Sequence, residues 1–363
     1  MELEKFAAQR FRNLQDLEVS AAPGMNVIYG ENAQGKTNLL EAVYVLSTLR
    51  SFRTKSLPET VQFGKADSLL EGRVRVQNSH HQLTLFLDRG SRHAMLDRKK
   101  AEALDYLGAL NVFLFSYPLL EVVRGGPEER RKFLDRSISM SRPGYLPVLM
   151  NYHRAVRQKT ALLAILQRGE ISRREGWNSL AAFNQQLLEH GLEVVRYRTS
   201  YLDQLQELLL DKQRLFFESD LIPGMELFSS FLTTREVAER KLNEVVDREI
   251  GRGVCLVGVH RDEVRLTLGG NELRKYGSSG QHRAFLLLVL LAQLELYEQW
   301  RDDRPVLLLD DLDSELDQKK IRSFLQEIRN RYQTWISTSR RELFETQPDH
   351  RLFEIRSGTL LEM

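Results

Sequence analysis

The 363-residue sequence is poor in cysteine, tryptophan and proline, and it has no long apolar run. Its one cysteine, Cys255, excludes an internal disulfide framework and a multi-cysteine zinc site, which favours a reducing compartment. The longest wholly apolar run, residues 284–292, is too short to span a bilayer. Residues 1–11 have neither the basic start nor the apolar stretch of a secretory signal. We therefore expect a cytoplasmic protein without a membrane segment.

The sequence also lacks a strong excess of either charge. Its 52 lysines and arginines nearly balance 50 aspartates and glutamates, which leaves a formal net charge of +2. The overall charge therefore does not indicate nucleic acid, and a DNA-binding surface would have to be a local patch. With 42% hydrophobic and 28% charged residues, the chain can bury a large core. Its length fits two domains or one domain with an insertion.

Strand-like and helical patterns alternate at both ends of the chain. A helix follows Lys36, because apolar residues recur there at helical spacing. A closing hairpin is predicted around Ser357 and Gly358. The apolar runs that predict strands are residues 27–29, 83–87, 112–115, 264–268, 306–309 and 334–337. Both ends therefore have α/β character.

Helical periodicity dominates for about a hundred residues after Pro127. Every seventh residue in one stretch is apolar, namely Leu188, Val195, Leu202 and Leu209. Thr199 and Gln206 interrupt the second seam that a long coiled coil needs. We predict an α/β domain made of residues 1–126 and 251–363, interrupted by an all-helical arm of residues 127–250. From sequence alone, an ordinary helical subdomain with no special task is an equal alternative.

A phosphate-binding loop is the strongest local motif. Residues 30–37, GENAQGKT, match the pattern G-x-x-x-x-G-K-[ST] between an apolar strand and an amphipathic helix. In such a loop, backbone N–H groups point at phosphate oxygens at the positive end of a helix. The lysine reaches the β and γ phosphates and the threonine hydroxyl holds Mg²⁺. The predicted ATP-binding residues are Gly30, Glu31, Asn32, Ala33, Gln34, Gly35, Lys36 and Thr37, with Thr37 also a Mg²⁺ ligand.

Two adjacent carboxylates end the apolar run of residues 306–309. A strand that ends in acids is a weak signal alone, but it gains weight beside a phosphate-binding loop, which needs a second Mg²⁺ ligand. We predict that Asp310 binds Mg²⁺ and that Asp311 is the general base or positions the attacking water. The long separation between the loop and these acids implies that the arm is an insertion within one nucleotide-binding domain.

A small polar tetrad comprising Ser278, Ser279, Gly280 and Gln281 precedes the apolar run of residues 284–292. Together with the acid pair and the segment Ser314-Glu315-Leu316-Asp317, the tetrad resembles the signature motif, Walker B motif and D-loop of ABC-type ATPases. Its N–H groups and the Ser278 hydroxyl, at a helix N-terminus, form a second anion-binding surface. Because the lysine loop already covers one side of the phosphates, this surface is most useful on a facing subunit. We predict that two ATP molecules are sandwiched in a homodimer, with Ser278 and Lys36 catalytic alongside Asp311.

Further segments make the resemblance more specific. The chain is similar to the RecF family, related to SMC ATPases, over nearly its whole length. The matching segments are FRN at 11–13, GENAQGKTNLLEA at 30–42, SFR at 51–53, GGPEERRKFLD at 125–135, GVHRDE at 258–263, SSGQHR at 278–283 and LLLDDLDSELD at 307–317. Departures from the family pattern occur at Val259, Glu263, Ser279 and His282, and none removes a phosphate donor or metal ligand. The resemblance implies an α/β P-loop ABC-type ATPase head.

The resemblance also implies a function. Members are expected to bind DNA, including duplexes and gap junctions, in an ATP-dependent manner, and to hydrolyse ATP slowly with stimulation by DNA. They are expected to act with RecR and RecO in loading recombinase during DNA repair, the SOS response and replication-fork maintenance. By analogy with the wider ABC group, Arg12 contacts the nucleotide. The histidine expected after the strand at 334–337 is absent, since Ser337 and Thr338 stand there.

Clusters of basic residues are candidates for the DNA surface. They comprise Arg50, Arg53, Lys55, Arg98, Lys99, Lys100, Arg130 and Arg131. Such contacts would be independent of DNA sequence and would weaken with salt. His260, Arg261 and Asp262 suggest a catalytic triad, but the sequence places no nucleophile beside them. Two alternatives remain, the nucleotide-binding subunit of an ABC transporter and an SMC-like scaffold that does not require hydrolysis.

Overall fold

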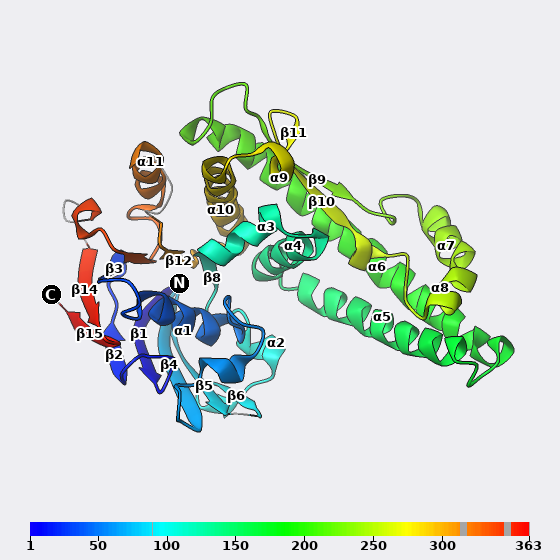
Figure 1. Cartoon of the computed structure of the whole chain (residues 1–363), viewed down its shortest axis with the longest axis horizontal. Coiled ribbons are helices and arrows are strands. Elements are labelled where there is room, and N and C mark those ends of the chain that lie inside the picture. The colour runs from blue at the N-terminus through cyan, green and yellow to red at the C-terminus, as the bar shows by residue number, and fades with distance from the viewer. Residues whose placement is uncertain (89, 313–317, 345–349, 363) are drawn as a thin grey trace. The chain divides into compact units, whose positions relative to one another are not determined.

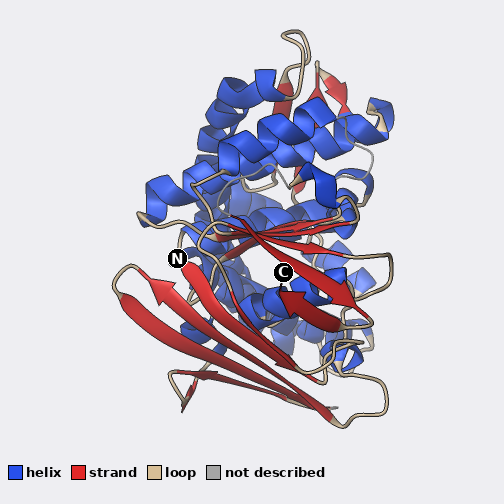
Figure 2. Cartoon of the chain, turned by 90° about the vertical axis from the view of Figure 1, so that its left-hand side faces the viewer, coloured by secondary structure: helices blue, strands red, loops and turns tan. Residues whose placement is uncertain are grey.

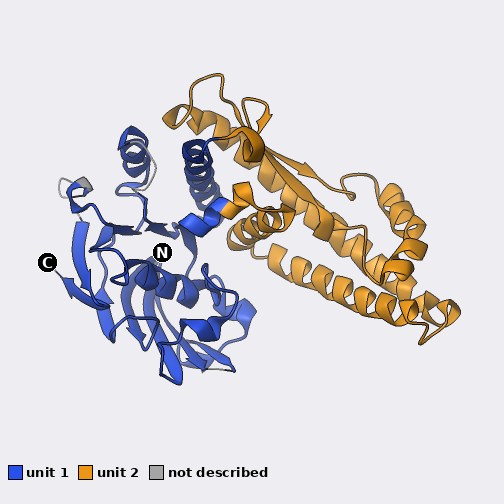
Figure 3. Cartoon of the chain, in the orientation of Figure 1, with its two compact units in different colours: residues 1–120, 278–363 blue, residues 121–277 orange. Residues whose placement is uncertain are grey.

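The computed structural model describes residues 1–88, 90–312, 318–344 and 350–362. The chain divides into two compact units, shown in different colours in Figure 3. Unit 1 combines Met1–Leu120 with Ser278–Met363, and unit 2 is Glu121–Gly277. Within the described ranges, no helix combines the length and the apolar character that a bilayer crossing needs.

Unit 1 contains a mostly parallel sheet with the strand order β15-β14-β3-β13-β12-β8. Its strands are β3 (Met25–Tyr29), β8 (Val112–Phe115), β12 (Val306–Asp310), β13 (Thr334–Thr338), β14 (His350–Arg356) and β15 (Thr359–Glu362). All neighbours are parallel except β14 and β15, which form the predicted closing hairpin. Every residue of β8, β12 and β13 is buried, as expected of parallel strands covered on both faces. The predicted strands at 27–29, 112–115, 306–309 and 334–337 are confirmed.

A second, antiparallel sheet of unit 1 has the order β2-β1-β4-β5-β6-β7. Its strands are β1 (Glu2–Gln9), β2 (Leu17–Ser20), β4 (Asp67–Val76), β5 (Ser79–Asp88), β6 (Arg92–Leu96) and β7 (Lys99–Lys100). Helix α1 (Lys36–Thr48) lies between the two sheets (Figure 2), and its Leu39, Leu40, Val43 and Leu46 are fully buried. One core therefore joins both sheets to the helix that starts at the phosphate-binding loop.

The remaining helices of unit 1 flank these sheets. They are η1 (Leu57–Thr60), α2 (Ala103–Tyr106), η2 (Tyr117–Leu120), α10 (Ser279–Arg301), α11 (Gln318–Ile328) and η5 (Arg341–Leu343). The run of residues 284–292 is buried within α10, which packs against β8 and α11. The buried helix predicted after the polar tetrad is therefore confirmed.

Unit 2 is built on two long helices, α5 (Tyr145–Gln167) and α6 (Arg173–Lys212), which lie side by side (Figure 1). The seven-residue apolar repeat on α6 is a buried face, because all four of its members are buried. The other elements are α3 (Glu121–Arg124), α4 (Pro127–Ser141), η3 (Gln213–Leu215), β9 (Pro223–Phe228), α7 (Arg235–Glu244), α8 (Val246–Arg252), η4 (Val259–Arg261), β10 (Glu263–Leu268), β11 (Asn271–Glu272) and α9 (Leu273–Tyr276).

Two features of unit 2 differ from the sequence prediction. The inserted part is not all helical, because β9 pairs with β10 and β10 with β11 in a three-stranded sheet. The same pairing shifts the domain boundary. Residues 251–277 were expected in the ATPase head, but β10 hydrogen-bonds to β9, so they belong to unit 2.

Candidate nucleotide-binding site

The phosphate-binding loop joins β3 to α1 and turns tightly at two glycines. Gly30 has a φ of 155° and Gly35 a φ of 118°, both in the region that favours glycine. A Cβ atom on Gly30 would lie 2.5 Å from the Ile355 carbonyl oxygen, so a side chain there would collide with the backbone of β14. The motif glycines therefore have steric reasons to be glycine, which supports a backbone that wraps around a ligand.

The lysine of the loop is folded over the loop itself. Lys36 Nζ donates to the carbonyl oxygens of Gly30 at 2.7 Å and Glu31 at 2.8 Å. Only 6% of Lys36 is exposed. Its ammonium is thus held within the loop at the N-terminus of a 13-residue helix, which is the electrostatic arrangement that anions prefer.

Two predicted metal ligands are in direct contact although they lie far apart in sequence. The Thr37 hydroxyl donates to Asp310 Oδ1 at 2.9 Å. The Ser337 hydroxyl donates to the same oxygen at 2.7 Å. Burial raises the pKa of the Asp310 carboxyl to about 6, while hydrogen bonds from Ser337 and Thr37 favour its charged form. Hydroxyl and carboxylate oxygens at one point fit a hard divalent cation such as Mg²⁺.

Mg²⁺ usually keeps several waters and adds substrate phosphates, so it needs few protein ligands. Among the described residues, no group of three or more His, Cys, Asp or Glu side chains could hold a metal ion by itself. A Mg²⁺ site at Thr37 and Asp310 would accordingly be completed by phosphate oxygens and water.

The second acid of the pair points elsewhere. Asp311 has a φ of 50°, a left-handed conformation that turns the chain sharply just after β12. Its backbone N–H donates to the Ser337 hydroxyl at 3.0 Å, which stabilises the turn. Asp310 is buried, whereas Asp311 is exposed at the carboxyl edge of the sheet. Adjacent residues of one type therefore have different surroundings and can serve different roles.

The polar tetrad caps α10. Ser278 Oγ accepts a hydrogen bond from the Gln281 N–H at 3.2 Å, and Gln281 Oε1 accepts one from the Ser278 N–H at 2.8 Å. This is a capping box at the start of a 23-residue helix. Ser278 and Ser279 are exposed. The Gln281 side chain is hydrogen-bonded in the cap. Its contribution to ligand binding would therefore be to stabilise the start of α10.

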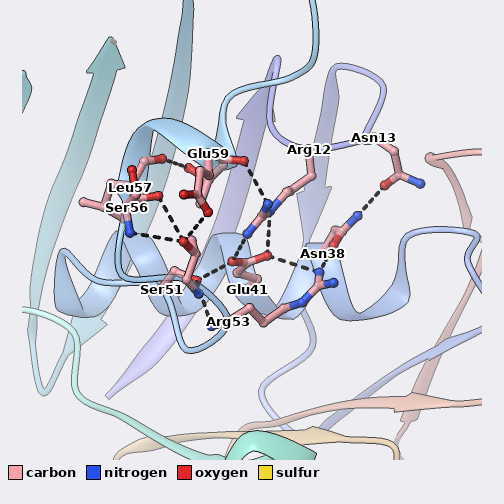
Figure 4. Close-up of polar contacts among 11 residues, drawn as sticks. Arg12, Asn13, Asn38, Glu41, Ser51, Arg53, Ser56, Leu57 and Glu59 are labelled. Atoms are coloured by element: carbon pink, nitrogen blue, oxygen red, sulfur yellow. Dashed lines mark hydrogen bonds and ion pairs between the residues drawn. The ribbon is translucent and has the colours of Figure 1, made fainter. Parts of the chain in front are cut away.

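Arg12 lies on the flank of α1 (Figure 4). Its guanidinium donates to both carboxylate oxygens of Glu41, at 3.0 and 2.7 Å, and to the Glu59 carbonyl at 2.8 Å. Glu41 is fully buried and also accepts from Ser51 and from Arg53. These contacts tie the segment after β1 and residues 51–53 to the helix of the phosphate-binding loop.

The family model described as RecF/RecN/SMC N terminal domain matches residues 2–359. The DNA replication and repair protein RecF of Geotalea uraniireducens is 33% identical to this chain over 377 aligned positions, with 99% of this chain and 100% of the relative covered. The chain belongs to the RecF family.

A solved structure also resembles the chain over its whole length. The structure titled as the recombination mediator protein RecF with ATP in the RecFOR pathway has a TM-score of 0.88 and 27% sequence identity, covering 100% of this chain and 99% of that one. A more distant Smc head bound to the C-winged helix domain of ScpA has a TM-score of 0.57 at 12% identity, which shows a shared fold. The RecF-like ABC-type head predicted from sequence is confirmed.

The candidate DNA-binding residues fall into two groups. Arg50, Arg53, Lys55 and the run from Arg98 to Lys100 are exposed on unit 1. Arg130 and Arg131, in unit 2, both have partners within the protein, but only Arg130 is buried, which argues against a phosphate contact for Arg130. Arg130 is 7% exposed and pairs with Glu263 at 2.7 Å. Arg131 donates to the Asp262 carbonyl at 2.6 Å.

The motif of His260, Arg261 and Asp262 helps to hold unit 2 together. Arg198 of α6 is buried, donates to both oxygens of Asp135 at 2.9 Å, and reaches Asp262 Oδ2 at 2.6 Å. His260 shares a 2.7 Å hydrogen bond with the Tyr152 hydroxyl of α5. Arg198 therefore joins two segments that carry the family resemblance, residues 125–135 and residues 258–263.

Sequence reasoning missed two residues of the site. Glu41 lies one helical turn after Thr37, and the i, i+4 spacing on α1 could have marked it. Ser337 is the residue before the last of the buried strand β13, where it pairs with Asp310 of β12, and the sequence marks it only by the absence of a histidine. The predicted D-loop, Ser314 to Asp317, lies outside the described residues.

Proposed function

We propose that this RecF-family protein is an ATP-dependent DNA-binding protein of recombinational repair and replication-fork maintenance, with slow, DNA-stimulated ATP hydrolysis. The observation that carries the proposal is the contact of Thr37 with Asp310 at 2.9 Å, next to the buried Lys36. This contact supports a phosphate anchor and a divalent-cation site at one edge of the sheet. A solved relative is titled as RecF with ATP, which supports ATP as the nucleotide.

In this proposal, the residues of the site have separate roles. Backbone N–H groups of residues 30–37 hold the α and β phosphates, and Lys36 neutralises the β and γ phosphates. Thr37 and Asp310 would hold Mg²⁺, which supplies Lewis-acid stabilisation of the charge on the phosphates. Asp311, exposed just beyond Asp310, orients the attacking water or accepts its proton. Arg12 approaches the nucleotide from the flank of α1.

The strand order supports a nucleotide shared between two subunits. Helix α10 packs against β8, whereas the phosphate-binding loop follows β3. Strands β13 and β12 lie between them, so roughly 14 Å separates the two strands at about 4.8 Å per spacing. That separation favours contact between Ser278–Gln281 and the ATP of a second copy, which gives an ATP-dependent homodimer.

Exposed basic residues support the DNA-binding part of the proposal. Arg50, Arg53 and Lys55 follow the helix of the phosphate-binding loop, and residues 98–100 lie at the β6–β7 turn. We expect them to contact backbone phosphates of duplex or gapped DNA without sequence preference. In the RecFOR setting named for the solved relative, RecO and RecR are the expected partners, and the cytoplasm is the expected compartment. Membership of the RecF family does not favour the transporter alternative.

Lys36→Ala provides the direct test. Loss of a charged phosphate contact should weaken ATP binding by roughly 10- to 100-fold. ATP affinity is measured by titration with a fluorescent ATP analogue, and turnover is measured with and without duplex DNA across a salt series. Lys65→Ala, an exposed lysine outside the site, is the matched control. Wild-type protein that neither binds ATP nor associates with DNA in its presence would contradict the proposal.

A further inference from the structure

The turn between β14 and β15 lies against the phosphate-binding loop. The two strands pair Arg356 with Thr359, so the turn consists of Ser357 and Gly358 alone. Both residues have a positive φ, 46° and 80°, which is the backbone that suits a two-residue hairpin turn. Gly358 is buried, and its carbonyl oxygen accepts from the Gln15 N–H at 3.0 Å. The turn is therefore held in one place by its surroundings.

Gln34, which precedes the second glycine of the motif, is bound to this turn twice. Its backbone carbonyl oxygen accepts from the Gly358 N–H at 2.9 Å. Its side-chain Oε1 accepts from the Ser357 N–H at 2.6 Å. The phosphate-binding motif leaves this position open to any residue, so the motif does not explain a glutamine there. The contact with the hairpin turn gives the glutamine a structural reason of its own.

The preceding carbonyl group of the loop is held from the same side. Asn13 Nδ2 donates to the Ala33 carbonyl oxygen at 3.4 Å, and Asn13 is a direct neighbour of Gly358. In a trans peptide the C=O and N–H groups point in opposite directions. Because the carbonyls of Ala33 and Gln34 are directed at Asn13 and at the turn, the N–H groups of Gln34 and Gly35 are directed away from them. Successive N–H groups that share one side of a loop form an anion-binding concavity.

We propose that the β14–β15 turn is a brace that presets the phosphate-binding loop for the nucleotide. With its carbonyls held at Ala33 and Gln34, the loop presents N–H groups to the α and β phosphates before the nucleotide arrives, so binding requires less ordering. The Gln34 side chain and Gly358 are thus positioning groups, which act through the backbone of the loop. The inference rests on the proposed function, because it requires a nucleotide at the loop.

Gly358→Ala tests the brace in the full-length protein. A Cβ atom there would lie 2.0 Å from the Asn13 carbonyl oxygen, so the turn and Asn13 must move apart. Gly64→Ala is the matched control, because Gly64 has nearly the same φ, 81°, but a Cβ atom there meets nothing within 4 Å. Calorimetry with Mg²⁺ measures the affinities for AMP-PNP and for ADP. Gly358→Ala should bind both nucleotides roughly 10- to 100-fold more weakly, the effect of misdirecting donors to a charged group, whereas Gly64→Ala should bind them like the wild type.

Gln34→Met tests the side-chain contact alone. Methionine keeps the length of the side chain but cannot accept from the Ser357 N–H, so both affinities should fall by roughly 2- to 10-fold, the effect of one hydrogen bond. Gln326→Met, at an exposed glutamine of α11, is the control and should bind like the wild type. In Gly358→Ala and Gln34→Met, the KM for ATP should rise while kcat stays near that of the wild type, because bound phosphates restore the direction of the N–H groups. A loss of folded protein would instead lower the turnover at saturating ATP and leave KM unchanged.

The outcomes separate the brace from the proposed function. Wild-type protein that binds neither nucleotide would contradict the proposed function. Affinities of Gly358→Ala equal to those of Gly64→Ala would overturn the brace. A loss confined to AMP-PNP would overturn it too, because the α and β phosphates are common to both nucleotides. If Gly358→Ala does not fold, Gln34→Met decides, and wild-type affinities and KM in that variant would overturn the inference.

Discussion

Asp310 and Asp311 show how two neighbouring residues of the same type acquire different chemistry. Asp310 ends β12 inside the protein and receives hydroxyl hydrogen bonds, whereas Asp311 turns out with a left-handed backbone. Burial raises the pKa of Asp310 to about 6. A bound divalent cation would favour the carboxylate form there. Asp311 is therefore the better candidate for handling the attacking water.

We expect Asp311→Asn to lower ATP turnover by about 10²-fold or more, the scale of losing a general base, while ATP still binds. The amide keeps the size of the side chain but cannot accept the proton. Steady-state phosphate release gives turnover, and titration with a fluorescent ATP analogue gives affinity. Asp303→Asn is a control outside the site, because Asp303 pairs with the chain's N-terminal amine. Unchanged turnover in Asp311→Asn would place the base elsewhere.

At the scale of single elements, the sequence predicted the strands that are buried on both faces and also β10, whose burial alternates, but it missed β1 and β9. β12 reads as continuous apolar residues up to its terminal acid, and all five of its residues are buried. β1 carries Glu2, Glu4 and Lys5 on its more exposed face, so its apolar positions did not stand out. β9 begins at a proline and contains a glycine, which weakens any strand signal. The pairing of β9 with β10 joins segments that lie far apart in sequence, so the sequence did not reveal it. The domain boundary was therefore predicted after residue 250 and lies after residue 277.

The candidate site shows the same division between local and tertiary information. The phosphate-binding loop and the capping box of α10 are contiguous motifs, so their residues and their elements were predictable. The bidentate pairing of Arg12 with Glu41 joins residues that are 29 positions apart, and no spacing rule specifies it. The burial of Arg130 depends likewise on Glu263, from a distant strand. A cluster of charges in a sequence suggests a binding surface, but only the fold shows which of those charges are paired within the protein.

His260, in η4 of unit 2, should make the free energy of unfolding depend on pH. Burial lowers the pKa of His260 to about 4, and its Nδ1 faces the Tyr152 hydroxyl. Between about pH 4 and the ordinary value of about 6.5, the unfolded chain binds a proton at His260 that the folded chain does not. The free energy of unfolding should therefore fall as the pH decreases through this window, by at most about 3 kcal/mol from this group.

Urea unfolding at several pH values, followed by circular dichroism, measures this slope. His260→Gln removes the titrating group, so we expect the variant to be less stable than the wild type at pH 7 and to lose stability less steeply between pH 6.5 and 4. Tyr152→Phe is a useful comparison, because it removes the hydroxyl at Nδ1 but keeps the ring. A slope in His260→Gln equal to that of the wild type would assign the pH dependence to other groups.

At the scale of the whole molecule, the proposed homodimer would couple nucleotide binding to assembly through Ser278. The exposed start of α10 would meet the γ phosphate held by a second copy, so ATP binding would favour the dimer. Ser278→Arg places a bulky side chain on that surface. We expect this variant to bind ATP as a monomer and to fail to dimerise with ATP, as measured by sedimentation with ATP and with ADP.

The substitution also removes a helix cap, which alone costs about 0.5–2 kcal/mol of stability. Ser172→Arg is the matched control, because Ser172 caps α6 with a capping box of the same kind. If lost capping were the cause, both variants would impair dimerisation through reduced stability. If Ser278 contacts the partner's nucleotide, Ser172→Arg dimerises with ATP while Ser278→Arg does not. ATP-dependent dimerisation of Ser278→Arg would show that the nucleotide is not shared through this surface.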